Sequence, residues 1–152
     1  MSKLTLVNEL HSSVRRNFRR RHFVTKGLDD LWQIDLIDIA RYHKKNHGFK
    51  YILVCIDLFS KYAWTRPLKS KLTSEVTAAM KSILMEGRIS KNLHSDEGGE
   101  FFSKTFGALM KKYNINHYKT YSGLKAAVAE RFIRTLKSHL WKLFTLQGSY
   151  QW

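Results

Sequence analysis

A nearly continuous apolar run, residues 50–59 (KYILVCIDLF), constrains the fold of this chain most strongly. Such a run is typical of a central strand that is buried on both faces of a sheet. Residues 32–39 before it alternate between apolar and polar side chains, and residues 61–68 after it have the pattern of a third strand that ends near Pro67. Three strands joined by short connections predict an antiparallel meander.

The second half of the chain alternates between helix and strand patterns. Helical periodicity covers residues 73–86, 104–113 and 124–145, and residues 92–96 and 115–121 have the pattern of short strands. Alternation of this kind implies that parallel strands are added to the meander. The sequence therefore predicts an α/β fold with a mixed sheet flanked by helices, in the element order βββαβαβα.

The charge of the chain indicates its class of partner. Lys and Arg total 27 against 12 Asp and Glu, which gives a formal net charge of +15 over 152 residues. An excess of this size favours nucleic acid as the partner. A membrane is not expected, because no apolar run is long enough to span one. The single cysteine, Cys55, fits a reducing compartment inside the cell.

Residues 1–28 differ from the rest, and we expect them to form a basic N-terminal arm or a short helix. Their basic stretch carries interleaved aromatics, which fits a phosphate-contacting arm or a nuclear address. A solvated basic face is the alternative. The candidate DNA-binding residues of this arm are Arg15, Arg16, Arg19, Arg20 and Arg21.

Three acidic residues stand in separate segments, each near a strand end or a helix start: Asp35 in WQIDLIDI, Asp96 in LHSDEGGEF and Glu130 in AAVAERFIRTLK. Clustered carboxylates cost free energy unless a cation compensates them. If the three converge, their oxygens suit Mg²⁺, and two such ions would serve the cutting or joining of a phosphodiester backbone. Each acid alone could instead be structural. The competing carboxylates are Asp38, Asp57, Glu97 and Glu100.

The last predicted helix carries cations on the same edge as Glu130. Arg134 and Lys137 follow Glu130 at positions i+4 and i+7, and Trp141 continues the edge. Arg134 could hold a phosphate through a bidentate fork, and Lys137 could hold one as a point charge. The predicted apolar side of this helix consists of Ala129, Ile133, Leu136, Leu140, Leu143 and Phe144.

Four segments together resemble the catalytic core of the DDE integrases of retroviruses, LTR retrotransposons and related DNA transposons. They are WQIDLID, YILVCIDLFSKYAWTRPL, LHSDEGGEF and YKTYSGLKAAVAERFIRTLK, within residues 28–145. DDLWQIDLIDI and KAAVAERFIRTLK are most similar to integrases of Maverick or Polinton transposons. The resemblance implies a ribonuclease H-like fold with a five-stranded mixed sheet. It implies that Asp35, Asp96 and Glu130 bind metal and that Arg134 and Lys137 contact element-end DNA.

The resemblance also implies a reaction that uses Mg²⁺ or Mn²⁺, with two ions bound. Water trims the 3′ end of element DNA, and the new 3′-hydroxyl then attacks target DNA. We therefore expect a nuclear enzyme that acts on double-stranded DNA, forms a homo-oligomer in its full-length form and does not bind membranes. Residues 29–152 would be a C-terminally truncated catalytic core, because the later core helices have no counterpart in the chain.

Two other functions stay open. A ribonuclease H-type nuclease of the same fold would need a fourth carboxylate, which Asp38 or Asp57 would have to supply. A catalytically silent DNA-binding relic would have no need of Asp35, Asp96 and Glu130. The histidines His43, His47, His94 and His117 lack metal-ligand spacing, and we expect them to be structural or solvent-facing.

Overall fold

The structure, a computed structural model, describes residues 2–11, 24–119 and 127–152. The strands are β1 (Leu31–Asp38), β2 (Tyr51–Asp57), β3 (Ala63–Leu68), β4 (Asn92–Ser95) and β5 (Asn116–Lys119). The helices are α1 (Lys3–Leu10), the 3₁₀ helix η1 (Ala40–Lys45), α2 (Thr73–Leu84), α3 (Lys104–Lys112) and α4 (Ala127–Gln147).

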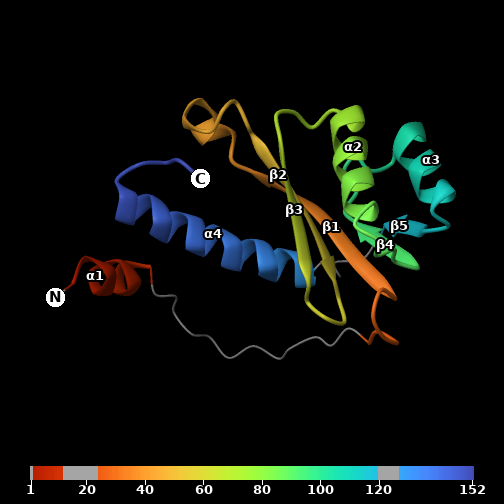
Figure 1. Ribbon diagram of the computed structural model, residues 1–152, viewed down its shortest axis with the longest axis horizontal. Helices are drawn as coiled ribbons and strands as arrows, with labels where there is room; N and C mark the ends of the chain where they lie inside the picture. The colour runs from red at the N-terminus through yellow and green to blue at the C-terminus, as the bar shows by residue number, and fades with distance from the viewer. Residues whose placement is uncertain (1, 12–23, 120–126) are drawn as a thin grey trace.

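The five strands form one mixed sheet in the order β3-β2-β1-β4-β5 (Figure 1). The first three are antiparallel neighbours, whereas β4 pairs parallel with both β1 and β5. The predicted mixed sheet and the order of its strands and helices are therefore confirmed. The apolar strand β2 lies between β1 and β3, away from both sheet edges.

Helices cover both faces of the sheet, with α4 on one side and α2 and α3 on the other (Figure 1). Successive side chains of a strand point to opposite faces. Trp32 and Ile34 of β1 accordingly belong to the core beneath α2 and α3. Ile37 and Ile39 belong to a second core, which includes Ile133 of α4. Asp35 lies in β1 between these apolar positions, so the alternation assigns it to the face that α4 covers.

Some element boundaries differ from the predicted ones. β3 begins at Ala63 rather than at residue 61, because Lys61 has a positive φ of 63° within the turn that precedes the strand. The predicted strand 115–121 is observed as Asn116–Lys119, and the predicted helix 124–145 as Ala127–Gln147. Residues 120–126, where those two predictions meet, lie outside the described residues.

The first residues of the chain form the short helix α1, which contacts α4. Lys3 Nζ donates to the carbonyl of Leu146 at 2.8 Å, and His11 Nε2 lies 2.9 Å from Thr145 Oγ1. Val7 is buried. The arginines of the predicted arm lie outside the described residues, and the division of the chain at residue 28 stays a prediction. None of the described helices is both long and apolar enough to cross a bilayer.

Candidate active site

Asp35 lies half-buried on β1. Its Oδ1 accepts a hydrogen bond from the Leu36 amide at 2.7 Å. Burial, and to a lesser extent the negative charges of Asp96 and Glu130, raise the pKa of Asp35 to about 6. The Leu36 amide and the cation of Lys137 act in the opposite direction. Asp35 is therefore within electrostatic reach of both other acids predicted for the site.

Asp96 follows β4 directly. The parallel register pairs Gln33 of β1 with His94 of β4, so Asp35 and Asp96 each lie two residues further along neighbouring strands. The carboxyl ends of parallel strands meet at one edge of a sheet, which is where sites in α/β proteins are usually built. Asp96 is exposed, and its Oδ1 accepts a hydrogen bond from the Gly98 amide at 3.1 Å.

The turn after Asp96 brings a further carboxylate to its side. A Cβ atom at Gly98 would lie 2.9 Å from the carboxyl group of Glu100 and 3.1 Å from Asp96 Oδ1. A side chain at position 98 would therefore have to displace the end of the Glu100 side chain. Glu100, one of the competing carboxylates of the sequence, therefore lies next to Asp96.

Glu130 is in the first turn of α4 and is half-buried. The start of α4 is bonded to β1 through Gln33, whose Oε1 accepts hydrogen bonds from the amides of Val128 at 3.1 Å and Ala129 at 3.0 Å. The Gln33 Nε2 atom lies 3.3 Å from Nδ1 of His94. Sequence reasoning missed Gln33. The available signal was a polar residue inside an apolar strand, two positions before Asp35 and on the same face.

The three acids offer oxygen donors that suit a hard divalent cation. None of them forms an ion pair within the described residues, unlike Asp29, Asp57, Glu86 and Glu97. A bound cation would relieve the repulsion between these carboxylates and the cost of burying their charge. In residues 2–11, 24–119 and 127–152, however, no three His, Cys, Asp or Glu side chains form a closed cluster ready to hold a metal ion. The oxygen atoms of the three acids suit Mg²⁺ or Mn²⁺, but the three side chains do not form a preassembled cluster in the described part of the chain.

The predicted DNA-contacting residues of α4 differ in their surroundings. Lys137 is half-buried, and its charge lowers the pKa of Asp35. Arg134 is exposed. Trp141, which the sequence places on the same edge, instead packs edge-on against Tyr42, with ring centroids 5.8 Å apart. The arm residues Arg15, Arg16, Arg19, Arg20 and Arg21 lie outside the described residues.

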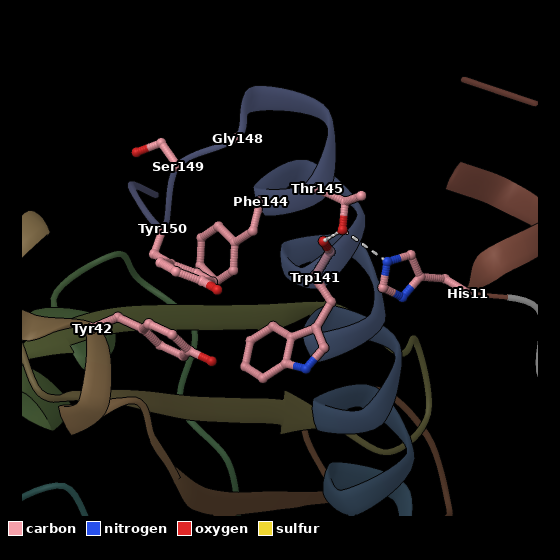
Figure 2. A pocket seen from close by; sticks show the side chains of 8 residues that line it. All are labelled: His11, Tyr42, Trp141, Phe144, Thr145, Gly148, Ser149 and Tyr150. Atoms are coloured by element: carbon pink, nitrogen blue, oxygen red, sulfur yellow. Dashed lines mark hydrogen bonds between the residues drawn. The ribbon is translucent and has the colours of Figure 1, made fainter. Parts of the chain in front are cut away.

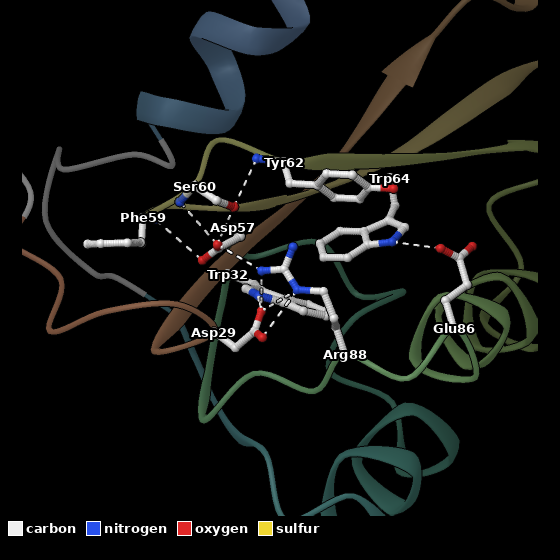
Figure 3. A network of polar contacts seen from close by, with 9 residues as sticks. All are labelled: Asp29, Trp32, Asp57, Phe59, Ser60, Tyr62, Trp64, Glu86 and Arg88. Atoms are coloured by element: carbon white, nitrogen blue, oxygen red, sulfur yellow. Dashed lines mark hydrogen bonds and ion pairs between the residues drawn. The ribbon is translucent and has the colours of Figure 1, made fainter.

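Asp57, the best alternative ligand by sequence, is held in a separate ion-pair network (Figure 3). It is fully buried and accepts hydrogen bonds from the Ser60 amide at 3.1 Å and from Arg88 Nη2 at 2.9 Å. Burial would raise the pKa of Asp57, but hydrogen bonds from Ser60, Phe59 and Arg88 outweigh it and hold the pKa below its usual range. Arg88 also pairs with Asp29. The surroundings of Asp57 are those of a structural ion pair.

The histidines have structural contacts. His117 Nε2 lies 2.9 Å from Ser95 Oγ, and its ring stacks on Phe102 with centroids 4.6 Å apart. Burial, reinforced by the charge of His94, lowers the pKa of His117 to about 4. Burial also lowers the pKa of His94. His43 Nδ1 lies 2.7 Å from the carbonyl of Ala40.

A hollow of about 430 Å³ lies at the other end of α4, between aromatic rings (Figure 2). Tyr42 stacks on Tyr150 with centroids 4.7 Å apart, and Trp141 stacks on Phe144 at 5.6 Å. At a rise of 1.5 Å per residue, Trp141, the first lining residue on α4, lies roughly 16 Å along the helix from Glu130. The hollow is therefore separate from the acidic residues.

Comparison with known proteins gives one family. The family model described as "Integrase core domain" matches residues 27–123. A transposon-derived protein of Caenorhabditis elegans is 37% identical over 108 residues, which are 70% of this chain and 38% of that protein. The chain thus spans well under half of this relative.

Solved structures share the fold. The simian T-cell lymphotropic virus intasome matches with a TM-score of 0.71 at 20% identity, over 95% of this chain and 54% of that one. The HTLV-2 integrase catalytic core domain in complex with magnesium matches with a TM-score of 0.64 at 20% identity, over 80% of this chain and 75% of that one. The mixed sheet with flanking helices is accordingly the ribonuclease H-like fold of those cores.

Proposed function

Because the chain belongs to the integrase core domain family, we propose that it is the catalytic core of a polynucleotidyl transferase that integrates DNA. It would trim the 3′ end of element DNA with water and then join the new 3′-hydroxyl to target DNA. The observation that carries the proposal is the parallel pairing of β1 with β4, which brings Asp35 and Asp96 to neighbouring strands, together with the bonding of Gln33 in β1 to the first turn of α4, which holds Glu130. A site that crowds acids in this way, in a chain of net charge +15, suits a metal held against a polyanion.

Asp35, Asp96 and Glu130 would hold the metal. A pair of Mg²⁺ or Mn²⁺ ions, when bound, supplies Lewis acidity at the attacking and leaving oxygens of an in-line displacement. The residues of the chain supply the rest. Asp35 is fixed by the Leu36 amide and Asp96 by the Gly98 amide, so two of the carboxylates are already oriented by backbone hydrogen bonds. Preorientation of this kind lowers the entropy lost when substrate and ions assemble.

Cations of α4 would hold the DNA beside these acids. Arg134 is exposed and offers a planar fork for a phosphate, and Lys137 offers a point charge next to Asp35. Contacts of this kind position the backbone without reading its sequence. We extend the proposal to Arg15, Arg16, Arg19, Arg20 and Arg21 as further phosphate contacts.

Several finer expectations belong to the same proposal. The full-length protein would act as a homo-oligomer on double-stranded DNA in the nucleus. Its kinship to Maverick or Polinton integrases is supported by the segments DDLWQIDLIDI and KAAVAERFIRTLK. Both points go beyond membership of the family.

The test is strand transfer of a labelled duplex end into plasmid DNA with Mg²⁺ or Mn²⁺. We expect Asp96→Asn to lower the rate at least about 100-fold, because several kcal/mol of metal-dependent stabilisation are lost. Glu97→Gln is the matched control, since Glu97 is the adjacent acid and pairs with Lys119 at 3.7 Å on the surface. It should stay within about threefold of the unmodified protein.

Three results would contradict the proposal. Activity that survives in Asp96→Asn would refute the assignment of the site. Cleavage of RNA–DNA hybrids without any strand transfer would indicate the ribonuclease H-type alternative. Salt-sensitive DNA binding without metal binding in calorimetry would indicate a silent relic.

A further inference from the structure

Gln33 is a fully buried polar residue at the centre of the sheet. A buried amide is costly unless its hydrogen bonds are made. Its Oε1 accepts from the amides of Val128 and Ala129. These belong to the first turn of α4, where backbone N–H groups have no carbonyl partner within the helix. The side chain of Gln33 therefore caps α4 from a neighbouring strand, 95 residues away from Val128 along the chain.

The orientation of this amide is set by its partners. Backbone N–H groups only donate, so the oxygen of Gln33 must face α4 and its Nε2 must face His94. A donor at Nε2 requires His94 Nδ1 to accept, which places the ring proton on Nε2 of a neutral imidazole. A flipped amide would set donors against donors at Val128 and Ala129. Gln33 thus has a single favourable orientation.

Gln33 and its three partners lie in three segments, β1, β4 and α4, each of which presents one acid of the candidate site. Asp35 is two residues after Gln33 on the same face of β1. Asp96 is two residues after His94 and Glu130 is one residue after Ala129. One buried amide therefore joins the backbones that present all three carboxylates.

We propose that Gln33 is a positioning residue that holds the start of α4 so that Glu130 reaches the metal bound by Asp35 and Asp96. This inference rests on the proposed function for the identity of the three ligands. Residues that orient metal ligands through a second layer of hydrogen bonds typically contribute 10–100-fold, roughly, to metal affinity. Gln33 does so by fixing backbone rather than by touching the ion.

The main test is Mn²⁺ binding by calorimetry to the full chain and to Gln33→Met, which keeps the length of the side chain and removes its hydrogen bonds. We expect affinity to fall at least about tenfold. The same substitution in a Glu130→Gln background should change affinity less than about threefold, because the ligand that Gln33 positions is already gone. Equal losses in both backgrounds would mean general destabilisation and overturn the proposal.

Asn46→Leu is the matched control. Asn46 is also a buried amide with three hydrogen bonds at 2.8 Å, to Tyr42, Tyr150 and Trp152, but it fixes the segment after the far end of α4. Asn46→Leu should lower stability and leave Mn²⁺ affinity unchanged.

Gln33→Glu keeps the acceptor oxygen, and its Mn²⁺ affinity should lie within about threefold of that of the unmodified protein. A loss in Gln33→Glu as large as in Gln33→Met would contradict the role of the oxygen.

A metal-free measurement keeps the test independent of variants that fail to fold. The amides of Val128 and Ala129 should be protected from hydrogen exchange in the unmodified protein, and free exchange there would overturn the proposal.

The outcomes of these experiments also distinguish failure of the proposed function from failure of the proposed role of Gln33. Weakened Mn²⁺ binding in Gln33→Met without strand transfer by any form would count against the proposed function alone. Unchanged binding beside normal strand transfer would count against Gln33 alone.

Discussion

At the scale of single residues, the carboxyl group of Asp35 is costly to keep charged in the folded, metal-free chain. Its pKa rises from the ordinary 3.8 to about 6 through burial and through the charges of Asp96 and Glu130. The folded state therefore binds a proton more tightly than the unfolded state. Stability from this residue is fully present below pH 4, falls as pH rises toward 6 and stays reduced above that.

We expect Asp35→Asn to be more stable than the unmodified protein at pH 7.5 in EDTA. The pKa difference corresponds to at most about 3 kcal/mol, and solvent screening of the half-buried side chain leaves about 1–2 kcal/mol. Asn keeps the oxygen that accepts from Leu36. Urea unfolding at pH 7.5 and pH 3.5 measures the gain, which should nearly vanish at the lower pH because Asp35 is then neutral in the folded state and mostly neutral in the unfolded state. Equal stability of the two proteins at both pH values would contradict this account.

At the scale of elements, Arg88 joins segments that meet only in the folded chain. It lies between α2 and β4, pairs with Asp29 before β1 at 2.5 Å, and pairs with Asp57 at the end of β2 at 2.9 Å (Figure 3). Its guanidinium carbon also lies 5.0 Å from the ring centre of Trp64 in β3. The planar, always charged guanidinium can make both ion pairs and the ring contact at once, which a lysine cannot.

We expect Arg88→Met to lower the free energy of unfolding by about 3–5 kcal/mol, because the fully buried carboxylate of Asp57 loses its counter-charge. Tryptophan fluorescence during urea unfolding measures this. Adding Asp57→Asn should recover part of the loss. Arg66→Met is the matched control, since the Arg66–Glu86 pair is 29% and 43% exposed and should contribute less than about 1 kcal/mol. Similar losses in Arg88→Met and Arg66→Met would refute the special role of Arg88.

At the scale of the whole molecule, the net charge of +15 predicts that the affinity for DNA depends on salt. Each phosphate that a cation neutralises releases counterions, so affinity falls with salt by a slope of about −0.9 per contact on logarithmic axes. Cations are spread over both faces of the sheet, on α4 and on α3. The proposed phosphate contacts are those of α4 and of the arm arginines, and the salt dependence can distinguish them from contacts on α3.

Replacing Arg19, Arg20 and Arg21 by Gln should reduce the steepness of the salt dependence by up to about 2.7, because three phosphate contacts are lost. Fluorescence anisotropy of a labelled duplex at several salt concentrations measures the slope. The matched control replaces three exposed lysines of α3, Lys104, Lys111 and Lys112. Their loss should change the slope by less than about one. A larger effect from α3 than from the arm would contradict the proposed role of the arm and assign the DNA contact to α3.

The mixed sheet could be predicted from local periodicity, and the candidate acids were chosen from their positions within the predicted elements. The apolar run of β2 and the alternation of β1 depend on neighbouring residues, so the mixed sheet could be predicted before any packing was known. Asp96 and Glu130 lie at a strand end and a helix start as expected, whereas Asp35 lies within β1, and the role of the three acids as metal ligands stays a prediction. The ends of β3 were less predictable, because the positive φ at Lys61 leaves no mark on periodicity.

Long-range packing settled what pattern could not. That Gln33 caps α4, that Arg88 neutralises Asp57, and that Trp141 packs against Tyr42 are contacts between segments 31 to 99 residues apart. The partner of a buried polar or aromatic side chain depends on which distant segment packs against it. The sequence around that side chain does not identify this segment. Local order therefore came from the sequence by itself, whereas the pairing of buried polar groups was decided by how the sheet and α4 close on one another.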